Sequence, residues 1–121
     1  MLLQRSSGAS LVANSISEND GSGVFVSGAS HADLAGNHID GNGADGVTVT
    51  GNSNVQLGDE PGILNPPNDT TVPNVGFGLR CSLNSSAAGR LATLTGEAGT
   101  KNFDPSCTNG LEDSPGLRGP R

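Results

Sequence analysis

The chain has 121 residues, which allows one domain at most, and it carries a formal net charge of −6. Between Ser6 and Leu79 there is no Lys or Arg, whereas Asp and Glu recur throughout that stretch. Nucleic acids and anionic membrane surfaces are bound through clustered cations, so the sequence excludes both partner classes. Aromatic residues make up only 2%, which excludes a wide core built on aromatic side chains.

The first part of the chain, residues 7–57, repeats with a fixed step of 23 residues. Leucine recurs three times on this step, and asparagine, isoleucine, glycine and valine each recur at least twice. The matched positions are Leu11/Leu34/Leu57, Asn14/Asn37, Ile16/Ile39, Asn19/Asn42, Gly23/Gly46, Val24/Val47 and Val26/Val49. A period of this size indicates stacked supersecondary units.

Each repeat predicts about three very short strands joined by Gly/Asn turns, because its glycine, asparagine and β-branched residues disfavour a helix. Val24 and Val26 would face the core and Phe25 the solvent. Asn19 and Asn42 occupy positions where we expect a left-handed turn residue. Stacked turns lie about 4.8 Å apart, so equivalent residues, including the glycines at 23 and 46, should form ladders.

The acidic residues fit this stacking. A shift of one repeat places Asp33 against Gln56 and Asp45 against Ser22, and no acid of the repeat falls on another acid. Stacked like charges would be costly at this spacing, so the pattern is the one that a coil requires.

The unit Asn-x-Ile-x-x-Asn-x-x-x-Gly-Val-x-Val, present at Asn14–Val26 and Asn37–Val49, resembles the right-handed parallel β-helix repeat of the pectate-lyase-like superfamily. The resemblance covers residues 7–58 and implies an all-β solenoid. That superfamily includes polysaccharide lyases, glycoside hydrolases, uronan epimerases, phage tailspikes and non-enzymatic surface proteins. It therefore implies an extracellular or periplasmic carbohydrate context without implying one reaction.

The period predicts the following organisation: coils over 1–58, a Pro/Asn-rich loop excursion over 59–74, terminal strands and a cap over 75–111, and a disordered tail over 112–121. Within the cap we expect one strand over 76–83 and a last strand over 90–96. Together they would cover the C-terminal end of the stack.

Two cysteines, Cys81 and Cys107, fall in this terminal region. An even count fits one disulfide bond in an exported protein, and two free thiols are the alternative. A bridge closing a loop of this size would stabilise the cap by about 3.5 kcal/mol on the chain-entropy model.

The N-terminal end opens almost directly into a repeat, with neither a hydrophobic signal segment nor a cap. We expect the chain to be the C-terminal part of a longer β-helix whose full-length form is extracellular or periplasmic. An uncapped first turn would be an exposed sheet edge, through which the protein could self-associate.

Three polar residues are the candidates for catalysis. If Leu34 and Ile39 face inward, then Asp33, His38 and Asp40 face outward, where enzymes of the resembling superfamily place catalytic groups. His–Asp pairs can act as a general base and its orienting group. The alternative is a set of solvated polar side chains on the outer face, which the absence of stacked functional neighbours favours.

Metal binding is a weaker expectation. Asp45, in a Gly/Asn-rich turn, is similar to one position of a calcium-binding β-roll, although the full motif is missing. A uronate lyase would need cations or calcium to hold the sugar carboxylate, and the coils contain no Lys or Arg. We expect no other cofactor.

The sequence therefore predicts a non-catalytic segment of an exported β-helix protein, acting as a surface, adhesive or carbohydrate-contacting scaffold. The alternative is the C-terminal remnant of a polysaccharide lyase, uronan epimerase or glycosidase with its active site on missing N-terminal coils. A third reading is a fragment without a function of its own.

Overall fold

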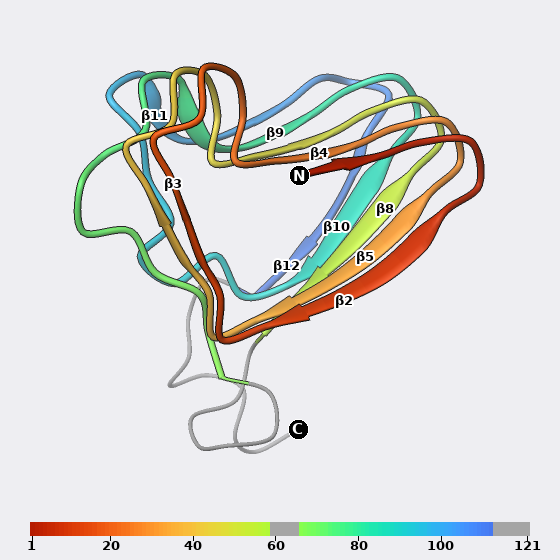
Figure 1. The fold of residues 1–121 in the computed structure, drawn as a ribbon. Helices are drawn as coiled ribbons and strands as arrows, with labels where there is room; N and C mark the ends of the chain where they lie inside the picture. Colours follow the sequence, from red (N-terminus) through yellow and green to blue (C-terminus); the bar gives the residue numbers. More distant parts are fainter. Residues whose placement is uncertain (59–65, 113–121) are drawn as a thin grey trace, which may run out of the picture.

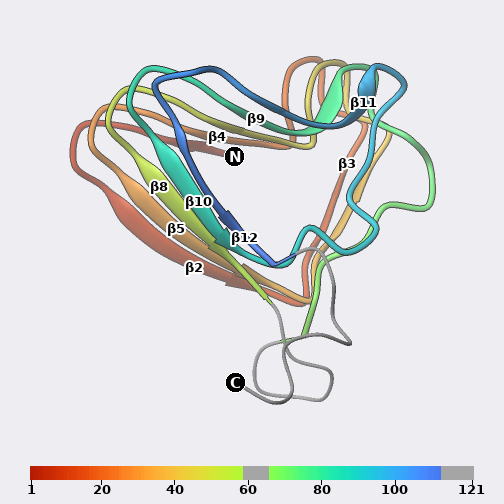
Figure 2. The same cartoon turned by 180° about the vertical axis from the view of Figure 1, so that it is seen from behind.

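The computed structural model describes residues 1–58 and 66–112. They form a coil with a three-sided outline, which Figures 1 and 2 show from opposite sides. No helix within these ranges is long and apolar enough to cross a membrane. The strands are β1 (Leu2–Leu3), β2 (Gly8–Val12), β3 (Ser15–Ser17), β4 (Val24–Val26), β5 (His31–Ala35), β6 (His38–Asp40), β7 (Val47–Val49), β8 (Asn54–Leu57), β9 (Phe77–Cys81), β10 (Ser86–Gly89), β11 (Gly99–Phe103) and β12 (Thr108–Leu111).

Each side of the coil is a parallel sheet. Two sides have the strand orders β1-β4-β7-β9-β11 and β2-β5-β8-β10-β12, and β3 pairs with β6 on the third side. The first turns keep the 23-residue step, because Leu11 pairs with Leu34 and Leu34 pairs with Leu57. This register confirms the predicted all-β parallel helix and its repeat length.

The length of a turn changes after β8. The step is 32 residues where Asn54 pairs with Ser86, and 22 residues where Ser86 pairs with Thr108. Residues 66–74 lie against β6, where the amide of Ile39 donates to the carbonyl of Asp69 at 2.9 Å. The predicted excursion over 59–74 is thus corrected: residues 66–74 belong to the third side, while 59–65 lie outside the described residues.

The core consists of columns of aliphatic side chains, as the alternating pattern predicts. The columns are Leu11/Leu34/Leu57, Ile16/Ile39, Val24/Val47/Leu79 and Val26/Val49/Cys81. All members are buried except Leu11 and Ile16, which belong to the first turn and are only partly covered. Phe25 points outward and is 37% exposed, which confirms the predicted parity.

The terminal region differs from the prediction in one element. The strand expected over 76–83 is present as β9, whereas residues 90–96 form a turn in which the amide of Leu94 donates to the carbonyl of Leu91 at 3.1 Å. Both leucines are buried. Residues three apart in a strand face opposite sides, so the chain must bend to bury both.

The strands of the terminal region form further turns of the stack, and the predicted cap over 75–111 stays a prediction. β9 and β11 extend one sheet, and β10 and β12 extend another. The described chain ends at Glu112, whose amide donates to the carbonyl of Gly89 at 2.7 Å. The disordered tail expected over 112–121 falls on residues 113–121, which lie outside the described residues.

A disulfide bond joins the last two turns. Cys81 at the end of β9 pairs with Cys107, which immediately precedes β12, with their Cα atoms 6.2 Å apart. The predicted pairing is confirmed, because Cys81 occupies a core column and Cys107 packs against that core.

Candidate functional site

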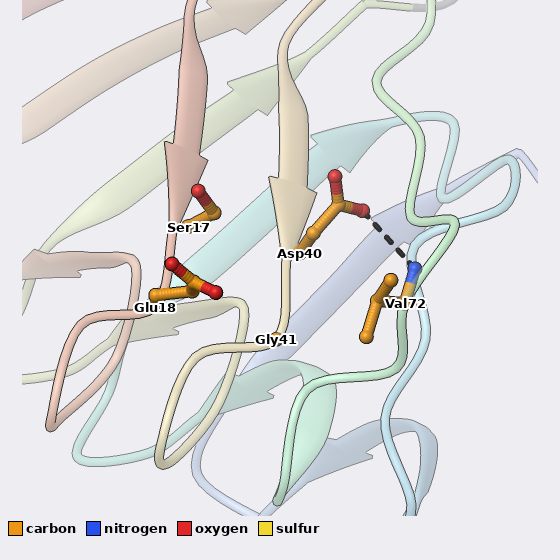
Figure 3. A pocket seen from close by; sticks show the side chains of 5 residues that line it. All are labelled: Ser17, Glu18, Asp40, Gly41 and Val72. Atoms are coloured by element: carbon orange, nitrogen blue, oxygen red, sulfur yellow. Dashed lines mark hydrogen bonds between the residues drawn. The ribbon is translucent and has the colours of Figure 1, made fainter.

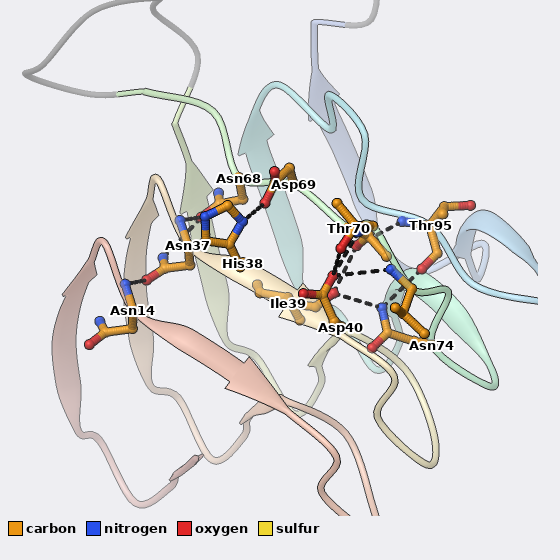
Figure 4. Close-up of polar contacts among 12 residues, drawn as sticks. Asn14, Asn37, His38, Ile39, Asp40, Asn68, Asp69, Thr70, Asn74 and Thr95 are labelled. Atoms are coloured by element: carbon orange, nitrogen blue, oxygen red, sulfur yellow. Dashed lines mark hydrogen bonds and ion pairs between the residues drawn. The ribbon is translucent and has the colours of Figure 1, made fainter.

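Two ladders of asparagine side chains fix the third side of the coil. One contains Asn14, Asn37 and Asn68, and Figure 4 shows its members in line. The other contains Asn19, Asn42 and Asn74. In both, the backbone amide of one asparagine donates to the Oδ1 of the asparagine in the next turn, at 2.9–3.1 Å.

The side-chain amide groups complete the ladders. Nδ2 of Asn42 donates to Oδ1 of Asn74 at 2.8 Å and back to the carbonyl of Ile16 at 3.2 Å. Asn37 repeats this pattern with Asn68 and with the carbonyl of Leu11. Buried polar groups need such partners, so these side-chain amides stabilise the bends on either side of the third sheet.

The predicted turn role of Asn19 and Asn42 is wrong, although their predicted ladder is confirmed. The left-handed residues are their predecessors, Glu18 with φ 58° and Gly41 with φ 59°. The residue before each asparagine makes the bend, because the asparagine side chain must point inward to reach its ladder.

The repeated glycines serve close packing. A Cβ at Gly23 would lie 2.8 Å from Nδ2 of Asn42, and one at Gly46 would lie 2.8 Å from the carbonyl oxygen of Gly78. Neither glycine has a positive φ. Glycine recurs at these two predicted ladder positions because the asparagine ladder and the next turn leave no space for a side chain there.

A pocket of about 390 Å³ opens on the outer surface of this side. Figure 3 shows its lining, which comes from three successive turns: Ser17, Glu18, Asp40, Gly41 and Val72. Oδ1 of Asp40 accepts hydrogen bonds from the amide of Thr71 at 2.7 Å and from its hydroxyl at 3.3 Å. The pocket therefore presents two carboxylates beside one exposed apolar side chain.

A second polar pair lies on the same side. Nδ1 of His38 lies 2.5 Å from Oδ1 of Asp69, and the two residues form a parallel β-bridge (Figure 4). Their side chains are 60% and 39% exposed, respectively. The expectation that the candidate groups have no stacked functional neighbour is thus wrong for His38, because residues 66–74 return to the coil.

Asp33, the third catalytic candidate, lies on a different sheet. It belongs to β5, and its Oδ1 lies 2.8 Å from Nε2 of His31. His31 also contacts Oδ1 of Asn54 through Nδ1. The structure brings His38 and Asp40 together on β6 and does not bring Asp33 to them. Catalysis by any of the three stays a prediction.

The contacts of His31 favour its protonated form. The hydrogen bond to Asn54 raises the pKa of the imidazole above its ordinary value of 6.5, partial burial lowers it, and the hydrogen bond and charge of Asp33 raise it. The two ring nitrogens lie beside Oδ1 of Asn54 and Oδ1 of Asp33, so a protonated ring can donate to both.

Asp45, the calcium candidate, is held by donors from its own chain. Oδ1 accepts from the amide of Phe77 at 2.9 Å, and Oδ2 accepts from Thr48 at 2.8 Å and from Nε of Arg80 at 3.0 Å. A guanidinium at this distance would repel a second cation. The carboxylate is therefore placed as a structural ion-pair partner, and the described residues contain no cluster of three or more His, Cys, Asp or Glu suited to a metal.

Sequence reasoning missed Glu18, Asn68, Asp69, Asn74 and Arg80 as parts of these arrangements. The two later asparagines lie 31 and 32 residues after their partners, so the 23-residue step passes over them. The spacing of Asn68 and Asn74, close to that of Asn37 and Asn42, is the signal that could have found them.

Comparison with known proteins identifies the family. The family model of the right-handed β-helix region matches residues 1–88. No curated protein and no solved structure matches the chain. Since the match covers most of the chain and agrees with the stacked parallel sheets, the chain belongs to the right-handed β-helix family.

Proposed function

We propose that the chain is a non-catalytic scaffold segment of an exported β-helix surface protein, and that the third side of its coil contacts carbohydrate. The observation that carries this proposal is the pocket in which Glu18 and Asp40 lie beside Val72. Carboxylate oxygens accept hydrogen bonds from sugar hydroxyls, and an apolar side chain can pack against the C–H face of a sugar ring.

The ligand class follows from charge. The residues that line the pocket include two acids and no base. A uronate carboxylate would be repelled there, whereas the hydroxyl groups of a neutral sugar would be favourable donors. We therefore infer a neutral, hydroxyl-rich glycan as the ligand.

The polar groups of this side support a binding role over a catalytic one. Asp40 accepts a hydrogen bond from the amide of Thr71, and His38 forms an ion pair with Asp69, so each candidate group has a partner of its own. General acid–base catalysis needs groups directed at one reacting atom, with pKa values near the working pH. The disulfide bond supports the exported location, because such bonds persist in oxidising compartments.

The test is binding of soluble oligosaccharides measured by calorimetry. We expect neutral glucan or galactan oligosaccharides to bind more tightly than galacturonate or alginate oligosaccharides. Asp40→Asn should weaken binding roughly tenfold, since a hydrogen bond to a charged group contributes about 1.5–3 kcal/mol. Asp33→Asn, on another sheet, is the matched control and should leave binding unchanged. Equal effects of the two variants, or no binding of any neutral oligosaccharide, would exclude the proposed site.

The second candidate function is part of a carbohydrate-active enzyme of lyase, epimerase or glycosidase type. The specific observation in its favour is that two carboxylates, those of Glu18 and Asp40, line one pocket, since most glycosidases act through a pair of carboxyl groups. Incubation with neutral polysaccharides, pectate and alginate, with and without Ca²⁺, distinguishes the two functions. New reducing ends or unsaturated products that disappear in Asp40→Asn would favour the enzyme.

A further inference from the structure

The turn between β9 and β10 carries an exposed asparagine whose side chain has no partner. Asn84 is exposed, and its backbone amide donates to Oγ of Ser106 at 2.9 Å. Within residues 1–58 and 66–112, no hydrogen bond engages its carboxamide. Leu83 and Asn84 both have a positive φ, 55° and 60°, which places the asparagine at a tight bend.

The residue two positions later completes a recognition sequence. Asn84, Ser85 and Ser86 form the pattern Asn-x-Ser, in which N-glycosyltransferases modify the asparagine. Ser85 is buried, and its Oγ accepts a hydrogen bond from the amide of Ser53 at 3.1 Å. Ser86 begins β10 on the opposite, outer face, and its hydroxyl makes no hydrogen bond within the part of the chain that the structure describes. The amide and the hydroxyl are therefore both accessible from outside the coil.

The fold itself does not require these two residue types. The preceding turns hold other residues, also with φ of 60–62°, at the position of Asn84: Ser6, Ala29 and Asn52. The register likewise places three residues without a hydroxyl at the position of Ser86: Gly8, His31 and Asn54. Among these four turns, only the one at 83–86 combines an asparagine with a hydroxyl two residues later.

A second match to the pattern is closed by its surroundings. Asn68, in the sequence Asn-Asp-Thr, is 1% exposed, and its Nδ2 donates to the carbonyl of Leu34 at 2.9 Å. Its Oδ1 accepts from the amide and Nδ2 of Asn37. A glycan on this nitrogen would break the ladder and would have no space inside the coil. The structure thus separates the two matches, since the folded chain exposes only Asn84.

We propose that Asn84 is an acceptor site for N-linked glycosylation by a sugar pyrophosphate. In the transfer, Nδ2 forms a bond to the anomeric carbon, the bond from that carbon to the pyrophosphate oxygen breaks, and the amide proton is lost as the pyrophosphate leaves. The proposal rests on the exported location inferred from the disulfide bond. It does not involve the glycan-binding pocket, because the corner between β9 and β10 lies opposite the third side (Figure 1).

The test incubates the purified, disulfide-bonded chain with UDP-glucose and a soluble N-glycosyltransferase that recognises Asn-x-Ser/Thr. Intact mass and peptide mapping should show one added hexose, at Asn84. Asn68 should react at least about tenfold more slowly, because its carboxamide is reached only through local unfolding. Short peptides covering residues 66–72 and 82–88 are the controls, and both should be modified because neither is held in the coil.

The preceding turn offers a matched variant. Asn52 is exposed and has the same turn conformation, but Asn54 stands where the hydroxyl is needed. Asn54→Ser should therefore make Asn52 a second acceptor, and Ser86→Ala should abolish transfer to Asn84 with an unchanged far-ultraviolet circular dichroism spectrum. The proposal is overturned if Asn84 of the folded chain stays unmodified while the 82–88 peptide reacts. Equal rates at Asn68 and Asn84 of the folded chain would also overturn it, because exposure would then not select the site.

Discussion

Replacing Asn42 by alanine should be among the most destabilising single changes in the coil. Its buried side chain accepts hydrogen bonds from the amide and Nδ2 of Asn19, at 3.1 and 2.9 Å. It donates to the carbonyl of Ile16 at 3.2 Å and to Oδ1 of Asn74 at 2.8 Å. Alanine removes all of these contacts and leaves the partners inside the coil without a replacement.

The expected magnitude follows from the number of bonds lost. A typical intramolecular hydrogen bond contributes about 1 kcal/mol net, so the loss of these contacts should lower the free energy of unfolding by about 4 kcal/mol. Asn19→Ala is the matched control. It deletes only the bond from Nδ2 to Asn42 at an exposed ladder end, so it should cost about 1 kcal/mol.

Urea unfolding followed by far-ultraviolet circular dichroism measures both variants, with the midpoint and the slope giving the change in free energy. Amide exchange in β3 and β6 provides a local readout, because these strands flank the ladder. If the two variants destabilise the coil equally, or if Asn42→Ala costs less than about 1 kcal/mol, the ladder does not hold the third side and the reasoning fails.

Three further outcomes follow from contacts described above. Gly46→Ala places a methyl group 2.8 Å from a carbonyl oxygen of the next turn and should lower the free energy of unfolding, measured in urea, by about 1–3 kcal/mol. Gly21→Ala is the control and should be nearly neutral, because nothing lies within 4 Å of the added methyl group. Equal effects of the two variants would contradict the packing argument. NMR titration of His31 should give a pKa above 6.5, since the contacts with Asn54 and then Asp33 raise it. Any stabilisation of the fold by the protonated ring should be present below the pKa of the unfolded chain and lost as the pH rises through the pKa of the folded chain. A measured pKa at or below 6.5 would exclude these contacts in solution. Reduction of the disulfide bond should lower the free energy of unfolding by about 3.5 kcal/mol on the chain-entropy model, measured by urea unfolding with and without reductant, and an unchanged midpoint would show that the bond does not constrain the unfolded chain.

The regular turns could be predicted from sequence because each core position recurs at a constant step. The columns through Leu34 and Val47 required only period and alternation. The return of residues 66–74 could not be predicted in this way. An insertion shifts the register from 23 to 31 residues at Asn68 and to 32 at Asn74, and a fixed-period comparison then pairs the wrong residues.

The candidate site was predictable only in part, for a similar reason. Parity placed His38 and Asp40 outward, and the structure agrees with this placement. Their partners Asp69 and Thr71 come from the turn with the altered register. The pairing of Asp45 with Arg80 joins residues 35 apart across that same change, so it depends on how the insertion is accommodated.

The disulfide bond affects the order in which the turns of the coil lose their structure. In a stacked fold each turn contacts mainly its neighbours, so loss of structure starts at an end and proceeds turn by turn. Cys81 and Cys107 tie the last turn to the one before it, whereas hydrogen bonds and packing alone hold β1, β2 and β3 to the second turn. Under mechanical load or protease attack, the turn that contains β1, β2 and β3 should therefore separate from its neighbour before the last two turns separate from each other.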